Sequence, residues 1–169
     1  MKIFISGSPG VGKTTLIKRL FLKNPQRFYG FWTEEIMEGG KRVGFKVITT
    51  WGESGVLAHI KLNSHYRVGK YAVDVSGFEK LVLPKIKNPL MDKILILDEI
   101  GKMEMFSKGF VETVERLIFL KDLDILATIP LKNVHPLIRK IKENFEVVYL
   151  TVENRNKVFE DLTLSLFQY

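Results

Sequence analysis

A glycine-rich octapeptide near the N-terminus constrains the fold of this chain more than any other feature. Residues 7–14, Gly-Ser-Pro-Gly-Val-Gly-Lys-Thr, fit the pattern G-x-x-x-x-G-K-[ST] in full. A short apolar strand predicted over residues 2–6 runs into it, and apolar residues at helical spacing follow it as far as Asn24-Pro25. Strand, glycine loop and helix in this order are the context in which the pattern binds phosphate. The sequence therefore predicts an α/β fold with a polyphosphate site at the start of its first helix.

The residue types in this loop suit a polyphosphate. Its glycines let the backbone curl so that N–H groups point inward, and the helix N-terminus adds partial positive charge. We expect Lys13 to act in catalysis on the β- and γ-phosphates and Thr14 to offer its hydroxyl group to Mg²⁺. A glycine turn that only caps a helix would not need Lys-Thr there. The predicted nucleotide-binding residues of the loop are Gly7, Ser8, Pro9, Gly10, Val11, Gly12, Lys13, Thr14 and Thr15.

An acidic pair follows the apolar run of residues 93–97. The carboxyl end of such a buried strand lies at the sheet edge where open α/β folds bind ligands. Asp98 is therefore predicted to join the nucleotide site as a Mg²⁺ ligand through water. Glu99, one residue on, is predicted to orient or deprotonate a water molecule aligned on the γ-phosphate. The alternative is that both acids are the polar start of a loop.

Strands and helices alternate through most of the remaining sequence. This alternation favours a mostly parallel, doubly wound sheet with right-handed crossovers. The expected elements are a helix opened by Ser107, a strand over 125–129, a helix over 134–143, a strand over 145–150 and a helix over 154–167.

The stretch from about residue 30 to residue 75 interrupts the alternation. β-like segments over 31–37 and 43–50 flank Glu-Gly-Gly-Lys, whose glycines supply the positive φ angles of a hairpin turn. We expect an antiparallel extension of the sheet within a single domain spanning residues 1–169. Ser76-Gly-Phe-Glu79 has capping-box spacing, which predicts a helix that starts at Gly77 and is kinked or ended by Pro84.

The amino-acid composition excludes several kinds of functional site. The chain has no cysteine, which excludes disulfide scaffolds, thiolate metal sites and cysteine nucleophiles. The apolar segment at the N-terminus is too short for the core of a signal peptide. We therefore expect a cytoplasmic protein without a membrane partner. A net charge of +7 favours an anionic partner, but the charge alone does not distinguish a nucleotide from a nucleic acid as that partner. Abundant lysine with little glutamine is typical of thermophiles.

Together these motifs resemble the small thermophilic P-loop nucleoside-triphosphatases related to the human cancer-related nucleoside-triphosphatase. The resemblance implies a RecA-like sheet in which the strand near Ile125 lies between the phosphate-loop strand and the Asp98 strand. It also implies slow, Mg²⁺-dependent hydrolysis of ATP, GTP, CTP and UTP to diphosphate and phosphate. The similar segments are residues 7–15, 30–36, 42–45, 98–104, 127–130, 135–136 and 153–155.

Weaker candidates have two interpretations each. Thr128 either senses the γ-phosphate or bonds to backbone at a strand end. Asn154 and Arg155 follow the last strand, where Arg155 either joins the nucleotide site by stacking on the base or starts a helix in water. Lys102 and Glu104 either orient the catalytic water or form a surface salt bridge.

Further candidates lie in the 30–75 extension. Of Glu34 and Glu35, strand alternation sends only one toward the cleft. The aromatic and basic segment 59–71 either stacks on single-stranded nucleic acid or is a solvated loop whose tyrosines pack on the sheet edge.

Two other functions stay open. The loop also resembles that of nucleotide kinases, although the arginines form no evident lid cluster. The positive charge would also suit a nucleotide-gated protein that binds nucleic acid. No arginine is assigned as a finger on the γ-phosphate, and the oligomeric state is left open.

Overall fold

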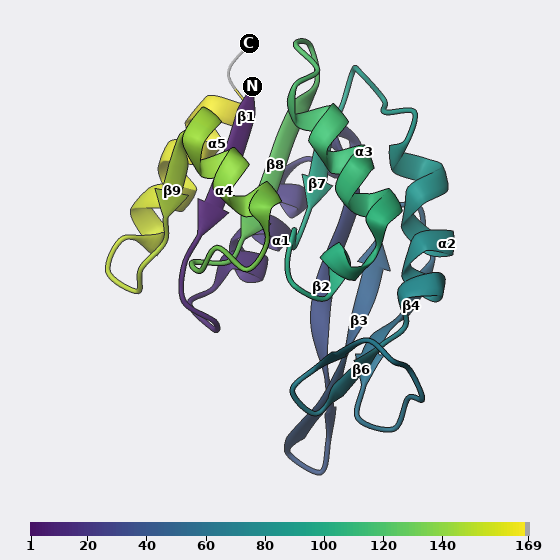
Figure 1. Cartoon of the computed structure of the whole chain (residues 1–169). Helices are drawn as coiled ribbons and strands as arrows, with labels where there is room; N and C mark the ends of the chain where they lie inside the picture. Colours follow the sequence, from purple (N-terminus) through teal and green to yellow (C-terminus); the bar gives the residue numbers. More distant parts are fainter. Residues whose placement is uncertain (168–169) are drawn as a thin grey trace.

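The strand that carries the glycine loop lies inside the sheet. In the computed structural model, which describes residues 1–167, β1 (Lys2–Ser6) pairs in parallel with β8 (Asp124–Ile129) and β9 (Val147–Tyr149). β8 also pairs in parallel with β7 (Ile94–Leu97). The strand at Ile125 therefore separates the phosphate-loop strand from the Asp98 strand, as the resemblance implied. The four parallel strands run downward in Figure 1, so their carboxyl ends lie at the same edge of the sheet.

All nine strands of residues 1–167 belong to one mixed sheet, in the order β5-β6-β4-β3-β2-β7-β8-β1-β9. The α/β fold with a mostly parallel core and an antiparallel extension is therefore confirmed. The remaining elements are α1 (Lys13–Lys23), η1 (Pro25–Arg27), β2 (Phe28–Glu38), β3 (Lys41–Thr49), β4 (Ser54–His59), β5 (Arg67–Val68), β6 (Tyr71–Val73), α2 (Val75–Ile86), η2 (Glu104–Phe106), α3 (Lys108–Ile118), α4 (Pro136–Asn144) and α5 (Arg155–Phe167).

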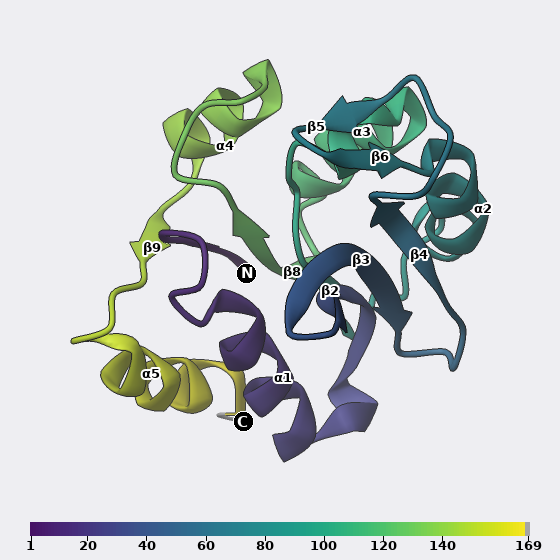
Figure 2. The same cartoon turned by 90° about the horizontal axis from the view of Figure 1, so that it is seen from below.

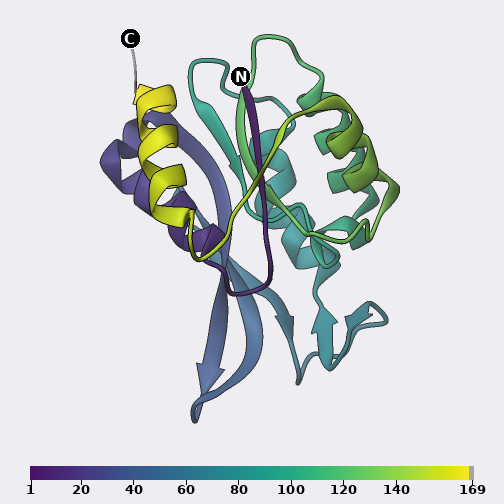
Figure 3. The same ribbon diagram turned by 90° about the vertical axis from the view of Figure 1, so that its left-hand side faces the viewer.

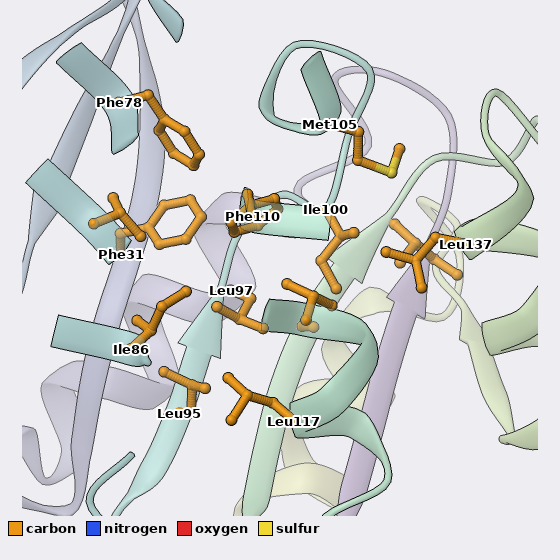
Figure 4. Packing of buried hydrophobic residues seen from close by; sticks show 14 of the residues in the cluster. Phe31, Phe78, Ile86, Leu95, Leu97, Ile100, Met105, Phe110, Leu117 and Leu137 are labelled. Atoms are coloured by element: carbon orange, nitrogen blue, oxygen red, sulfur yellow. The ribbon is translucent and has the colours of Figure 1, made fainter. Parts of the chain in front are cut away.

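Helices cover both faces of the sheet. Figure 3 shows α1 and α5 on one side of the sheet and α3 and α4 on the other. The face shared by α2, α3 and α4 buries the larger apolar cluster, in which the rings of Phe31, Phe78 and Phe110 pack edge to face (Figure 4). The face under α1 and α5 buries a second cluster around Ile5 and Ile17. This layering confirms a doubly wound arrangement.

β2 belongs to both parts of the sheet. Its first residues, Phe28–Phe31, pair in parallel with β7, and Phe31–Glu38 pair antiparallel with β3. The strand therefore begins earlier than the predicted residue 31. At the tip of the β2–β3 hairpin Gly39 and Gly40 have φ angles of 57° and 76°, as the hairpin prediction required.

The predicted start of α2 is wrong. The carboxylate of Asp74 caps this helix by accepting a hydrogen bond from the Gly77 N–H group at 2.9 Å, and the helix begins at Val75. The Asp74 N–H group donates to Leu57 O, so the sheet ladder ends at the residue that starts the helix. Ser76 is already helical and cannot be the cap. Pro84 lies inside α2, which continues to Ile86.

The segment 59–71 contains a short strand that the sequence did not predict. β5 pairs with β6. The Tyr71 ring lies 5.2 Å from Phe45 and the Tyr66 ring 5.2 Å from Phe106, measured between centroids. Tyr71 therefore packs on the extension of the sheet, and Tyr66 packs on η2. Within residues 1–167, no helix combines the length and the apolar character that a membrane crossing requires.

Candidate functional site

The glycine loop turns the chain from β1 directly into α1. Gly12 is the N-cap of α1 with φ 110°, a left-handed backbone conformation that side chains other than glycine rarely adopt. Gly10 also has a positive φ of 80°. Ser8, Pro9 and Gly10 are exposed, and the loop between β1 and α1 can be followed from below in Figure 2. The loop therefore presents its backbone to solvent at the helix N-terminus, where an anion binds best.

Lys13 connects the loop to the second motif. Its Nζ atom donates a hydrogen bond to Gly7 O at 2.7 Å and lies 3.6 Å from Glu99 Oε2. The Lys13 side chain is only 11% exposed. A cation and a carboxylate predicted from distant parts of the sequence are therefore brought together at the loop.

Asp98 is the polar centre of the site. It is 2% exposed, and each of its carboxylate oxygens accepts one hydroxyl hydrogen bond. Thr14 Oγ1 donates to Oδ2 at 2.7 Å, and Thr128 Oγ1 donates to Oδ1 at 2.5 Å. Burial raises the pKa of Asp98 to about 6, although both hydrogen bonds oppose the rise. The first turn of α1, the end of β7 and strand β8 thus place two hydroxyl groups on one buried carboxylate.

The interpretation that the Thr128 hydroxyl group bonds to backbone is wrong, and its sensing of the γ-phosphate stays a prediction. Its hydroxyl group donates to the side chain of Asp98 instead of to backbone, and the residue is fully buried. This contact joins residues 30 positions apart, because β7 and β8 are paired strands. The contact could not be read from the local sequence.

Glu99 is partly exposed, with 28% of its side chain accessible. Burial raises its pKa, and the neighbouring Lys13 ammonium opposes this effect. The peptide bond between Asp98 and Glu99 is cis. The two acids therefore differ in environment: Asp98 is enclosed by hydroxyl groups, and Glu99 lies beside Lys13.

Arg155 reaches the loop, as expected of a residue near the nucleotide. It is exposed at the start of α5, and its Nη1 atom donates to Val11 O at 3.3 Å. Asn154 serves its own loop: Oδ1 accepts from Thr151 N and Nδ2 donates to Tyr149 O. The structure brings Arg155 to the phosphate loop, and stacking of Arg155 on a base stays a prediction.

The expectation of a surface salt bridge is wrong for Glu104. Glu104 is 4% exposed because η2 turns it inward beneath the Asp98-Glu99 pair, whereas Lys102 is exposed. Glu34 accepts from Lys18 of α1 at 2.6 Å, and Glu35 accepts from Arg42 at 3.1 Å. Strand alternation therefore separates the two glutamates, and Glu34 is the one that faces the helix of the phosphate loop.

The oxygen atoms of Thr14 and Asp98 fit Mg²⁺, which prefers hard oxygen ligands and keeps several waters. Within residues 1–167, His, Asp and Glu side chains form no group of three or more able to hold a metal. A metal at Thr14 and Asp98 would therefore complete its coordination with phosphate oxygens and water, the usual arrangement for this ion.

Comparison with known proteins identifies the family. A family model described as NTPase matches residues 2–163. The chain belongs to this NTPase family. Members similar to it include the nucleoside-triphosphatase THEP1 of Aquifex aeolicus, 41% identical with 99% of each chain covered. The cancer-related nucleoside-triphosphatase of Homo sapiens is 37% identical, with 95% of this chain and 93% of the human protein covered.

Solved structures of the NTPase family have the same fold. The crystal structure of THEP1 from the hyperthermophile Aquifex aeolicus superposes with a TM-score of 0.89, at 40% identity and with 99% of this chain and 100% of that chain covered. The solution structure of a human cancer-related nucleoside triphosphatase gives a TM-score of 0.80, at 37% identity over 98% and 97% of the two chains. The predicted family is therefore confirmed over nearly the whole length.

Proposed function

We propose that this protein is a Mg²⁺-dependent nucleoside-triphosphate phosphohydrolase that releases nucleoside diphosphate and phosphate. The observation that carries this proposal is the convergence of Lys13, Thr14, Asp98 and Glu99 at one end of the sheet, next to an exposed glycine loop. Membership of the NTPase family supports it independently. We also infer a single domain, because both apolar clusters pack on one sheet.

Binding of the triphosphate is assigned to the loop. The backbone N–H groups of residues 7–15 surround the phosphates, and the Lys13 ammonium neutralises charge on the β- and γ-phosphates. Thr14 and Asp98 would hold Mg²⁺, which when bound neutralises charge that builds up on the phosphate oxygens. The 2.7 Å contact between Thr14 and Asp98 supports this pairing, since both oxygens already face the same point.

Glu99 is assigned as the residue that prepares water. Its carboxylate accepts a proton from a water molecule whose oxygen forms a bond to the γ-phosphorus. The bond from that phosphorus to the bridging oxygen breaks, and the nucleoside diphosphate leaves with the electron pair. The raised pKa of Glu99 suits this role, because a base is most effective when its pKa approaches the working pH.

The surroundings of the loop support slow turnover and broad base tolerance. An arginine that stabilises the γ-phosphate accelerates related reactions by roughly 10³–10⁵-fold. Arg155 instead donates to Val11 O beside the loop, where it would stack on a base. The side-chain amide of Asn154 is occupied within its own loop, so it does not distinguish one base edge from another.

The decisive experiment compares phosphate release from ATP, GTP, CTP and UTP by the wild type and by Glu99→Gln. The variant should bind a nucleotide analogue with unchanged affinity and hydrolyse all four substrates at least about 100-fold more slowly. Glu146→Gln, an exposed change before β9, is the matched control and should behave as wild type.

Other outcomes would redirect the proposal. Equal loss of binding and turnover in Glu99→Gln would remove its assigned role. Phosphate that appears only as transfer to an added nucleotide would favour a kinase. Salt-sensitive retention of RNA or DNA by Lys13→Ala would favour a nucleic-acid-binding protein.

A further inference from the structure

Glu104 is a buried carboxyl group that the proposed reaction does not use. It is 4% exposed, and within residues 1–167 no Lys, Arg or His nitrogen lies within 4.0 Å of its carboxyl oxygens. Burying an unpaired carboxylate is costly, whereas an uncharged carboxyl group needs only hydrogen bonds. The environment of Glu104 therefore favours its protonated form.

The buried carboxyl group lies next to Glu99. A Cβ atom placed on Gly101 would come 2.3 Å from Glu99 Oε1 and 2.9 Å from Glu104 Oε1. Both oxygens thus lie within 2.9 Å of one point, in space that is open only because residue 101 is glycine. A charge on Glu99 therefore disfavours a second charge on Glu104.

The neighbours decide which acid is protonated. Glu99 lies 3.6 Å from the Lys13 ammonium, which favours a charged carboxylate. Glu104 lacks such a cation, and burial together with the charges of Glu99 and Asp98 raises its pKa well above the usual range, although the backbone N–H groups of Glu104 and Gly101 oppose the rise. A protonated carboxyl group in an apolar site is a hydrogen-bond donor.

The segment that carries Glu104 is firmly anchored. Ile100 and Met105 are buried in the larger apolar cluster on either side of it (Figure 4). The Met105 N–H group donates to Gly101 O at 2.9 Å, and the Ser107 N–H group donates to Glu104 O at 3.1 Å. Glu104 is therefore a fixed group against which a mobile carboxylate can be oriented.

We propose that Glu104 is a positioning residue for Glu99. Its uncharged carboxyl group donates a hydrogen bond to the Glu99 carboxylate and holds the other oxygen of Glu99 toward Lys13 and the phosphate loop. This inference rests on the proposed role of Glu99 as the group that prepares water. It adds a second acid whose function is to retain its proton.

The test is a matched pair of substitutions at one site. Glu104→Gln keeps a donor of similar length, and kcat should stay within about threefold of wild type. Glu104→Met keeps the volume but removes the donor, and kcat should fall about tenfold or more. KM and the affinity for a nucleotide analogue should be unchanged in both, because neither variant alters the loop.

A purely structural role predicts a different pattern. A buried methionine would then support wild-type turnover, and this result would overturn the inference. An equal loss of kcat in the glutamine and methionine variants would also overturn it. In a Glu99→Gln background, Glu104→Met should cause no further loss, because the carboxylate that it orients is already gone.

Infrared spectroscopy supplies a readout that does not require the methionine variant to fold. At neutral pH the wild type should show the carbonyl stretch of a protonated carboxyl group, and Glu104→Gln should lack this band. A wild type without the band contradicts the inference. If Glu99→Gln retains full turnover, the proposed function of Glu99 fails separately, whereas loss in Glu99→Gln with full turnover in Glu104→Met rejects only the role of Glu104.

Discussion

The buried carboxylate of Asp98 is enclosed by two hydroxyl groups. Thr14 and Thr128 each donate one hydrogen bond to it, and these bonds offset part of the cost of burying its charge. Burial still outweighs them, so the pKa rises from the usual 3.8 to about 6. Between these two pH values the folded protein binds more protons at Asp98 than the unfolded chain does. The contribution of Asp98 to stability therefore decreases as the pH rises through this window.

Replacing Asp98 by Asn tests this cost directly. The amide carries no charge at any pH, so Asp98→Asn lacks the loss of stability that the wild type shows as the pH rises. Between about pH 5 and pH 7, the free energy of unfolding of the variant minus that of the wild type should therefore increase by on the order of 1 kcal/mol. Denaturant unfolding across this range measures the difference. Turnover by the variant should be lost. A difference in stability that stays flat with pH would show that Asp98 titrates near its usual value.

At the scale of elements, short polar side chains start two of the helices. α2 shows this most clearly, because Asp74 closes the ladder to β4 with its N–H group and caps the helix with its carboxylate. α3 is capped in the same way by Ser107, which accepts from Phe110 N at 3.0 Å. A short polar residue at the junction thus satisfies donors that the helix leaves unpaired.

The two candidate caps of α2 can be separated by substitution. Asp74→Ala should lower the free energy of unfolding by about 1 kcal/mol, because the Gly77 N–H group loses its acceptor. Ser76→Ala should change it by less than about 0.5 kcal/mol, since Ser76 is not the cap. Thermal or denaturant unfolding of both variants measures this, and phosphate release should be unchanged in each. A larger effect for Ser76→Ala would restore the capping box.

The sequence predicts those parts of the fold and the site that depend on residues adjacent in the chain. Residues 7–14 specify a loop, and the apolar run before Asp98 specifies a buried strand, so both positions were predictable. Thr14 was expected near Asp98, because both were predicted as ligands of Mg²⁺. The contact from Thr128 to Asp98 was not predicted, because it spans 30 residues and depends on strand order. Glu104 was a candidate from the sequence, but its burial was not predicted, because only the three-dimensional turn at Gly101 places it inside.

At the scale of the whole molecule, a ligand that binds only the folded state stabilises it. With Mg²⁺ and a non-hydrolysable triphosphate at about 100 times Kd, the expected gain is about 2.7 kcal/mol. For a chain of this size, this corresponds to a rise in Tm of roughly 5–10 °C. Lys13→Ala should abolish the rise, whereas Lys140→Ala, which removes a surface ion pair with Glu115, should retain it. A shift that persists without Lys13 would place the anion elsewhere on this positively charged protein.

The position of β1 has a consequence for how the protein is made. Both strands that pair with β1, namely β8 and β9, are encoded after residue 120, so they leave the ribosome later than β1 does. A nascent chain that has emerged only as far as α3 therefore has a complete loop sequence but no partner strands to hold it. Under the proposed function, the nucleotide site is therefore complete only after β8 and β9 have been made and have paired with β1.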